Sequence, residues 1–203
     1  MSLVQLIRLM REDARAALER DPAAERLSDI LLFSVGTHAV WAHRWHHWLY
    51  GRGLRHLALW LSTRTRRRLG VDIHPAATIG RRLTIDHGMG VVIGSTAVIG
   101  DDCILYQGVT LGMTGGRPHG KRHPTLGSNV LVGTNAVVLG DITVGDGSKV
   151  GAGAVVVDDV PRDVTVAGVP ARIVRDRRHG GFHLVEPSVG EPADESVRWS
   201  CAL

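Results

Sequence analysis

Few features of this 203-residue sequence are typical of a secreted or membrane protein. Its two cysteines, Cys103 and Cys201, are far apart, which excludes a disulfide framework and fits a reducing cytoplasm. No apolar run reaches the roughly 18 residues of a membrane span. The first residues lack the long apolar stretch and the cleavage site of a signal peptide. We therefore expect a cytoplasmic protein that does not bind membranes.

Aromatic residues and clustered charge are also scarce. Aromatic residues form 4% of the chain and few follow residue 60, so the stacking platforms that bind single-stranded nucleic acids are missing. The net charge is +4, but the basic residues are dispersed except in two short runs, 64–68 and 175–178, which we interpret as solvated surface. With 44% hydrophobic residues the chain can bury a core, and we expect a globular protein with no nucleic-acid partner.

Residues 2–69 carry apolar side chains at helical spacing and predict a small α-helical domain. Ser2 is placed as the N-cap of the first helix. Asp21 precedes Pro22, and this pair is typical of the cap and first turn of a second helix. The last helix is expected to end at Leu69–Gly70, where glycine can end a helix and the preceding arginines complement its dipole.

Three tryptophans in this helical region follow one helix face. Trp41, Trp45 and Trp48 have i, i+4, i+7 spacing, which predicts a buried stripe. His43 and His47 are four residues apart and could hold a metal ion. Because no third ligand lies nearby in the sequence, we interpret them as side chains that flank an aromatic core.

Beyond Gly70, large aliphatic residues recur every six positions, separated by Gly, Ala, Ser, Thr, Asn and Asp. This period matches neither an ordinary strand nor a helix, and each unit is too small to fold alone, so the units must stack. We predict a parallel β-helix shaped as a triangular prism, with three short strands per coil and one buried anchor per strand. The anchors are Ile73, Ile79, Ile85, Ile93, Ile99, Leu105, Leu111, Leu126, Val132, Val138, Val144, Val150 and Val156.

Two interruptions of the six-residue period carry polar residues. The first, between the third and fourth anchors, adds two residues to the step and contains Asp86 and His87. The second, residues 112–125, is rich in Gly, Pro and charge. Insertions in solenoids emerge as loops on one face. If each coil takes eighteen residues, Asp72 lies near His87 on a neighbouring strand or corner, and the two side chains can touch.

Several segments of the sequence resemble the serine O-acetyltransferases among the hexapeptide-repeat acyltransferases. The resemblance covers roughly residues 1–175 and rests on "RDPAAE", "GVDIHPAATIG", "IDHGMGVVIG", "LYQGVTLG", "GKRHPTLG" and "AGVPARIV". It implies a mainly β protein with an α-helical N-terminal part, whose β-helix is left-handed. We expect a helical domain at 1–69, a catalytic β-helix at 70–175 with a protruding loop at 112–125, and a flexible tail at 176–203.

The resemblance also implies transfer of an acetyl group from acetyl-CoA to the hydroxyl of L-serine, for cysteine synthesis. A serine hydroxyl is a poor nucleophile at neutral pH, so a base must take its proton, and histidine suits this task. We assign that role to His87. By the resemblance, Asp72 orients its ring, and backbone N–H groups around Gly112 are candidates to receive the oxyanion. We expect no metal.

Four further residues match positions that hold the amino acid in the family. Asp21 and Asp86 would bind its ammonium group, and Arg122 and His123 its carboxylate. Each also has a structural reading: Asp21 can be a helix cap, while Arg122 and His123 can belong to an exposed loop. His74 is interpreted as a corner residue.

The resemblance further places CoA in a groove between adjacent subunits. The residues matched there are Gly112, Thr134, Lys149 and Ala152, of which Lys149 could reach a phosphate. A shared groove implies a homotrimer, and the helical domain could pair two trimers into a hexamer. The tail, which ends in the apolar Leu203, could dock O-acetylserine sulfhydrylase.

Alternatives remain open from the sequence. The chain departs from the usual family segments at 94–97 and 112–115, so the acceptor could be a related hydroxyl compound such as homoserine. A zinc lyase could use His87, His119 and His123 as ligands, although two of these histidines share one loop. A binding module that uses its tail to dock a partner is the third possibility.

Overall fold

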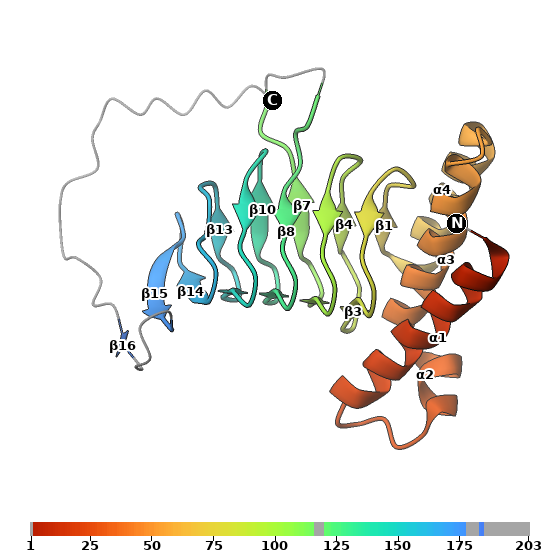
Figure 1. Ribbon diagram of the computed structural model, residues 1–203, viewed down its shortest axis with the longest axis horizontal. Helices are drawn as coiled ribbons and strands as arrows, with labels where there is room; N and C mark the ends of the chain where they lie inside the picture. Colours follow the sequence, from red (N-terminus) through yellow and green to blue (C-terminus); the bar gives the residue numbers. More distant parts are fainter. Residues whose placement is uncertain (1, 116–119, 178–182, 185–203) are drawn as a thin grey trace.

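The computed structural model describes residues 2–115, 120–177 and 183–184. Four α-helices stand at one end of a prism made of short parallel strands, and a loop protrudes from the middle of the prism between β7 and β8 (Figure 1). The helices are α1 (Leu3–Arg20), α2 (Leu27–Phe33), α3 (Val35–Tyr50) and α4 (Arg55–Leu69). No helix of the described residues is long and apolar enough to cross a membrane.

Helix boundaries follow local capping chemistry. Ser2 caps α1 as predicted, because its side chain accepts a hydrogen bond from the backbone N–H of Gln5 while the Gln5 side chain accepts one from the N–H of Ser2. Helix α4 ends at Leu69, as predicted, and Gly70 follows in the left-handed conformation with φ 68°.

The second helix begins later than the sequence predicted. Asp21 is the C-cap of α1: its N–H donates to the carbonyl of Ala17, and its carboxylate accepts from the N–H of Ala23 at 2.9 Å. Helix α2 starts at Leu27 instead, where the carboxylate of Asp29 accepts hydrogen bonds from the two backbone N–H groups that precede the helix. The Asp-Pro pair therefore belongs to a turn between two helices.

The prediction that the tryptophan stripe is buried is wrong. Trp45 is 38% exposed and Trp41 and Trp48 are half-buried. The opposite side of α3 packs against the end of the prism, and a Cβ at Gly36 would lie 1.8 Å from the carbonyl oxygen of Ile85. Such close contact needs small residues, so the large tryptophans face the other way.

In the part of the chain that the structure describes, sixteen short strands follow α4, and fifteen of them build the prism or close its far end. Three sheets take every third strand of the coil, with parallel pairing throughout except at the far end, where β15 pairs antiparallel with β14 and β16. The strands are β1 (Asp72–Ile73), β2 (Thr78–Ile79), β3 (Thr84–Ile85), β4 (Val92–Ile93), β5 (Val98–Ile99), β6 (Ile104–Leu105), β7 (Thr110–Gly112), β8 (Thr125–Leu126), β9 (Leu131–Val132), β10 (Val137–Leu139), β11 (Thr143–Val144), β12 (Lys149–Val150), β13 (Val155–Val156), β14 (Val164–Ala167), β15 (Arg172–Asp176) and β16 (His183–Leu184).

The register of these strands confirms the six-residue period and refines it. Asp72 pairs with Val92, a step of twenty residues, because the turn before β4 is two residues longer than the others. Steps that do not span this turn are of eighteen residues, as where Val137 pairs with Val155, except where the protruding loop lengthens the coil and at the step from β12 to β14. Twelve of the thirteen predicted anchors are buried, and Ile79, in the first coil, is partly buried. The result is the left-handed parallel β-helix that was expected.

Turns between the strands form three long edges of the prism, which we name by a feature of each. The loop edge joins the β1 sheet to the β2 sheet through residues 74–77, 94–97, 113–124 and 140–142. The arginine edge joins the β2 sheet to the β3 sheet through 80–83, 100–103, 127–130 and 145–148. The His87 edge joins the β3 sheet to the β1 sheet through 86–91, 106–109, 133–136 and 151–154. A side of about six residues spans roughly 20 Å, so one small molecule cannot contact two edges of one chain.

Candidate active site

His87 lies on the His87 edge, in the long turn between β3 and β4. Its backbone is in the left-handed region with φ 58°, and the residue is exposed. Gly88 lies beneath it, where an added Cβ would come 3.3 Å from a methyl group of Val71. The neighbouring Asp86 is half-buried. The turn thus presents an imidazole to solvent on a rigid, tightly packed support.

Asp72 begins the strand against which this turn rests. Its backbone N–H donates to the carbonyl of Val91 at 2.8 Å, and the N–H of Gly90 donates to the carbonyl of Gly70 at 2.8 Å. The Asp72 carboxylate accepts a hydrogen bond from the guanidinium of Arg66 at 3.1 Å, and both side chains are partly exposed. Within the described residues, no hydrogen bond joins Asp72 to His87.

Arg122 and His123 lie on the loop edge, where the loop returns to the prism. The hydroxyl of Thr96 accepts hydrogen bonds from the backbone N–H of Arg122 at 3.0 Å and of His123 at 3.1 Å. The N–H of Thr96 donates in turn to Nδ1 of His123 at 3.2 Å. This bond assigns the imidazole proton to Nε2. Burial, aided by the charges of Arg122 and Lys121, lowers the pKa of His123 below 6.5, so the ring is neutral at neutral pH.

Gly94 makes room for the His123 ring. A Cβ at this glycine would lie 2.0 Å from two atoms of the imidazole, so the ring occupies the space that a side chain at position 94 would fill. Neither Gly94 nor Thr96 was among the predicted site residues. The signal that could have found them is their register with 74–77, the turn of the first coil, which carries a histidine of its own.

Cations surround the base of the loop. The guanidinium of Arg122 donates to the hydroxyl of Ser95 at 3.2 Å and has no carboxylate partner in the part of the chain that the structure describes. The Lys121 ammonium donates to the carbonyls of Thr96 and His123, which ties the loop to the coil beneath. An open cavity of about 280 Å³ lies here, lined by Thr114, Gly115, Lys121, Arg122 and Asp141. Asp141 lies 3.9 Å from the Lys121 ammonium and offsets its charge, so among the described residues the Arg122 guanidinium is the cation left to bind a small anion.

Asp21 lies at the end of α1, beside the arginine edge. The preceding Arg20 fastens this helix end to the prism, because its guanidinium donates to the carbonyl of Arg82, the hydroxyl of Thr84 and the carboxylate of Asp102, each at 2.8 Å. Asp21 is therefore held near the start of β3, the two-residue strand that leads into the turn of Asp86 and His87.

The residues predicted to contact CoA divide between two edges. Thr134 and Ala152 lie on the His87 edge in successive turns, which are joined by a hydrogen bond from the N–H of Gly153 to the carbonyl of Thr134 at 2.8 Å. Lys149 is exposed at the start of β12. Gly112 ends β7, at the base of the protruding loop.

A zinc site finds no support among the described residues, where no group of three His, Cys, Asp or Glu side chains is arranged to hold a metal ion. His87 and His123 lie on different edges of the prism. His119, the third ligand considered, lies outside the described residues.

Comparison with known proteins supports the hexapeptide-repeat fold. A family model described as "Bacterial transferase hexapeptide (six repeats)" matches residues 123–158, and one described as "Serine acetyltransferase, N-terminal" matches residues 2–42. Together with the stacked coils, these matches define a hexapeptide-repeat transferase.

Individual relatives show to which family of hexapeptide-repeat transferases the chain belongs. A serine acetyltransferase of Bacillus subtilis is 52% identical over 167 residues, which are 82% of this chain and 76% of the relative. A serine acetyltransferase of Brucella abortus, solved in complex with coenzyme A, has a TM-score of 0.82 and 45% identity over 85% of this chain and 68% of its own. That of Neisseria gonorrhoeae, in complex with serine, has a TM-score of 0.80 and 47% identity over 83% of this chain and 69% of its own. The chain belongs to the serine acetyltransferase family.

Proposed function

We propose that this chain transfers the acetyl group of acetyl-CoA to the hydroxyl of L-serine, giving O-acetylserine and CoA. The observation that carries the proposal is an exposed histidine on a rigid prism turn, in a chain about half identical to serine acetyltransferases. In the reaction the serine oxygen forms a bond to the acetyl carbon, the C–S bond of the thioester breaks, and the serine proton ends on the CoA thiol.

His87 is the general base of this mechanism. An exposed imidazole can take the hydroxyl proton as attack begins and return it to the leaving thiolate. Asp72 would orient the ring by accepting a hydrogen bond from its other nitrogen. The contact with Arg66 uses one carboxylate oxygen of Asp72, so the other can accept from the imidazole. Where the two partners compete, an exposed ion pair of this kind is worth only about 0–1 kcal/mol. Exchange of partners therefore costs little.

Arg122 and His123 hold the acceptor carboxylate. The guanidinium can bind it with two parallel hydrogen bonds, and the fixed Nε2–H of the imidazole adds a third donor. Asp86, beside the base, and Asp21 hold the ammonium group. Two acids for the ammonium and one guanidinium for the carboxylate complement the charges of a zwitterionic amino acid.

These groups converge only if two copies of the chain meet. His87 and His123 of one chain lie on different edges, roughly 20 Å apart. We therefore infer that the loop edge of one copy faces the His87 edge of the next, which closes into a homotrimer around a threefold axis. The helical part exposes apolar side chains such as Leu32 (66%) and Phe33 (76%), and pairing of two trimers there would give a hexamer.

CoA would lie in the groove between the facing edges. The turns that contain Thr134 and Ala152 are lined by small side chains, which let a narrow pantetheine arm approach the backbone. Lys149 would reach a phosphate, and backbone N–H groups near Gly112 would stabilise the oxyanion. Of the predicted tail 176–203 the structure describes residues 176–177 and 183–184, where Asp176 ends β15 and β16 pairs with it. Leu203 and the rest of the tail lie outside the described residues, and the sulfhydrylase partner, like a cytoplasmic location, remains part of the proposal.

Replacement of His87 tests the function. We expect His87→Ala to lower serine-dependent CoA release by about 100-fold or more, because general-base catalysis contributes roughly two to four decades in rate. His56→Ala is the matched control, since His56 is an exposed histidine on α4 and should change the rate little. Thiol detection with a panel of acceptors, serine and homoserine included, measures both the loss and the acceptor preference. Near-full turnover by His87→Ala would contradict the proposal.

A further inference from the structure

The loop edge carries a second imidazole that the proposed mechanism does not use. His74 follows β1 in the first turn of this edge and is half-buried. Its Nδ1 accepts a hydrogen bond from the backbone N–H of Ala76 at 3.0 Å. The proton of the neutral ring is therefore on Nε2, which is left as a free donor.

His123 occupies the equivalent place in the next coil. Ile73 pairs with Ile93, so position 94 corresponds to His74 and Thr96 corresponds to Ala76. Gly94 has no side chain, and the His123 ring fills that space and accepts from the N–H of Thr96, as His74 accepts from Ala76. Two imidazoles with the same proton arrangement thus occupy equivalent places in neighbouring coils, whose strands are about 4.8 Å apart.

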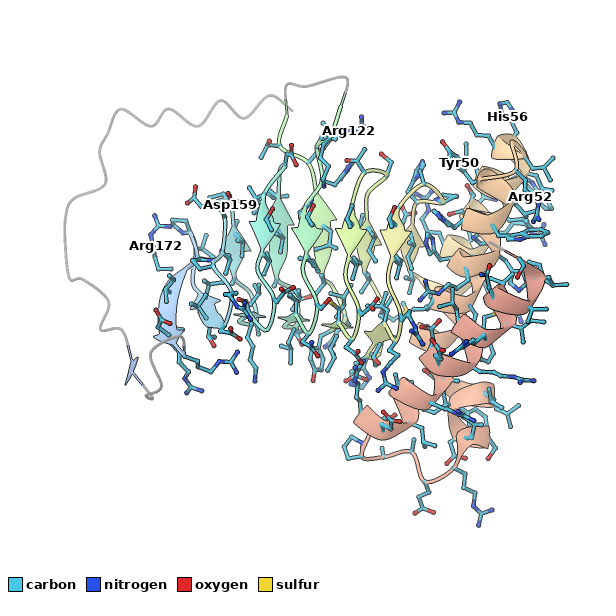
Figure 2. The ribbon with its side chains drawn as sticks, viewed as in Figure 1. Tyr50, Arg52, His56, Arg122, Asp159 and Arg172 are labelled. Carbon is cyan, nitrogen blue, oxygen red and sulfur yellow. The ribbon has the colours of Figure 1, made fainter. Side chains whose placement is uncertain are left out.

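The surroundings of His74 favour an anionic ligand. Burial is the main reason that its pKa is lowered; nearby Asp72 opposes this effect, and the charges of Arg55 and Arg122 add to it. The ring of Tyr50, at the end of α3, stands edge-on to His74 with 6.1 Å between ring centres. Tyr50 and Arg122 lie toward the same side of the molecule (Figure 2). An N–H donor whose ring is fixed by Ala76, on the same edge as the Arg122 guanidinium, is well placed to bind a carboxylate.

We propose that His74 is a further acceptor-binding residue, whose Nε2–H donates a hydrogen bond to the carboxylate of the hydroxy amino acid. The inference rests on the proposed function, in which Arg122 and His123 hold that same carboxylate. His74 extends their site by one coil toward the helices. Its bond to Ala76 fixes the ring, so the donor is oriented before the acceptor binds.

Two substitutions separate this role from that of a corner residue. In His74→Asn the amide oxygen takes the place of Nδ1, so the hydrogen bond from Ala76 can remain while the outward donor is lost. In His74→Gln the longer side chain places an amide N–H near the position of Nε2. A residue that only shaped the corner would tolerate asparagine and suffer from glutamine, which is the opposite of what the proposal requires.

The experiment is steady-state kinetics of both variants with L-serine and acetyl-CoA. We expect His74→Asn to raise the KM for L-serine about tenfold, the usual effect of losing one hydrogen bond to a charged group, with kcat and the KM for acetyl-CoA changed less than about twofold. His74→Gln should stay within about threefold of the wild type. An unchanged KM in His74→Asn, or equal impairment of the two variants, would overturn the inference. Failure of the wild-type chain to acetylate serine would instead overturn the proposed function.

Discussion

The helical part and the prism differ in how many charged and polar side chains they bury. The prism core consists of aliphatic and small side chains, with one anchor per strand. The helical part buries Asp13 and Arg44 as an ion pair and also buries His43 and His46, while it exposes large apolar residues such as Phe33. The prism is thus stabilised mainly by repetition of one non-directional contact, whereas the helical part adds a few directional contacts to a small apolar cluster.

Directional contacts also fix where the helices sit on the prism. Arg44 donates to Asp13 on α1 and to the carbonyls of Ile79 and Gly80 in the first coil. One buried guanidinium therefore joins two helices to the arginine edge. Since α1 carries Asp21, this junction also determines the position of a proposed substrate-binding group.

The largest effect is expected from breaking the buried pair. Asp13→Ala leaves the Arg44 guanidinium buried without its carboxylate, which should lower the free energy of unfolding by about 3–5 kcal/mol. Four of the five tryptophans lie in the helical region, so urea denaturation followed by tryptophan fluorescence reports on this part. Glu19→Gln, which breaks an exposed pair with Arg82, should cost at most about 1 kcal/mol. Equal losses in the two variants would show that burial does not distinguish the pairs.

A smaller effect is expected in the prism core. Ile99 is 1% exposed, and Ile99→Val should lower the free energy of unfolding by about 0.5–1.5 kcal/mol through one lost methylene. Ile79→Val removes the same group from an anchor at the partly exposed end, so its cost should be smaller. Far-ultraviolet circular dichroism in urea measures both. A larger cost at Ile79 would mean that contacts with the helices dominate the first coil.

A third effect, of about the size expected for Ile99→Val, concerns pH. Burial lowers the pKa of His46 from 6.5 to about 4, so the folded state holds a neutral ring. As the pH falls from about 6.5 toward 4, the unfolded chain takes up a proton that the folded chain does not, and stability is lost. His43 acts in the same direction because of its burial. We expect about 1 kcal/mol from His46 between pH 7 and 5, allowing for solvent screening. If His46→Gln showed the wild-type pH dependence of the urea midpoint, the histidine would not be its cause.

The two regions also differ in how much of them could be predicted from the sequence. The six-residue period predicted the strands and almost every buried anchor, because each anchor faces the same environment. In a repeat, a local exception does not hide the pattern set by the other units. The first coil takes twenty residues because its turn carries the extra pair, and only the length of that turn signalled it. In the helical part, the spacing predicted that the tryptophans share one face of α3, but not that this face points away from the prism. Packing of Gly36 against Ile85 decides which face of α3 is buried there.

The candidate site, too, could be predicted from the sequence only in part. The family segments named its residues, including His87 and Arg122, but which edges they occupy follows from the three-dimensional coil alone. The contact between Arg66 and Asp72 joins two segments of different type, so no periodicity signals it. The substitution of the His123 ring for a side chain at position 94 is likewise a packing relation between distant segments.

The protruding loop has a consequence for how such enzymes diversify. β7 and β8 keep their pairing with β4 and β5 in the coil before and with β10 and β11 in the coil after, although the loop separates them in the chain. The solenoid resumes in register however many residues leave it at this corner. Loops of other lengths and chemistries can therefore be exchanged there, which would change the groups offered to a ligand while the turn that carries His87, on another edge, keeps its place in the coil.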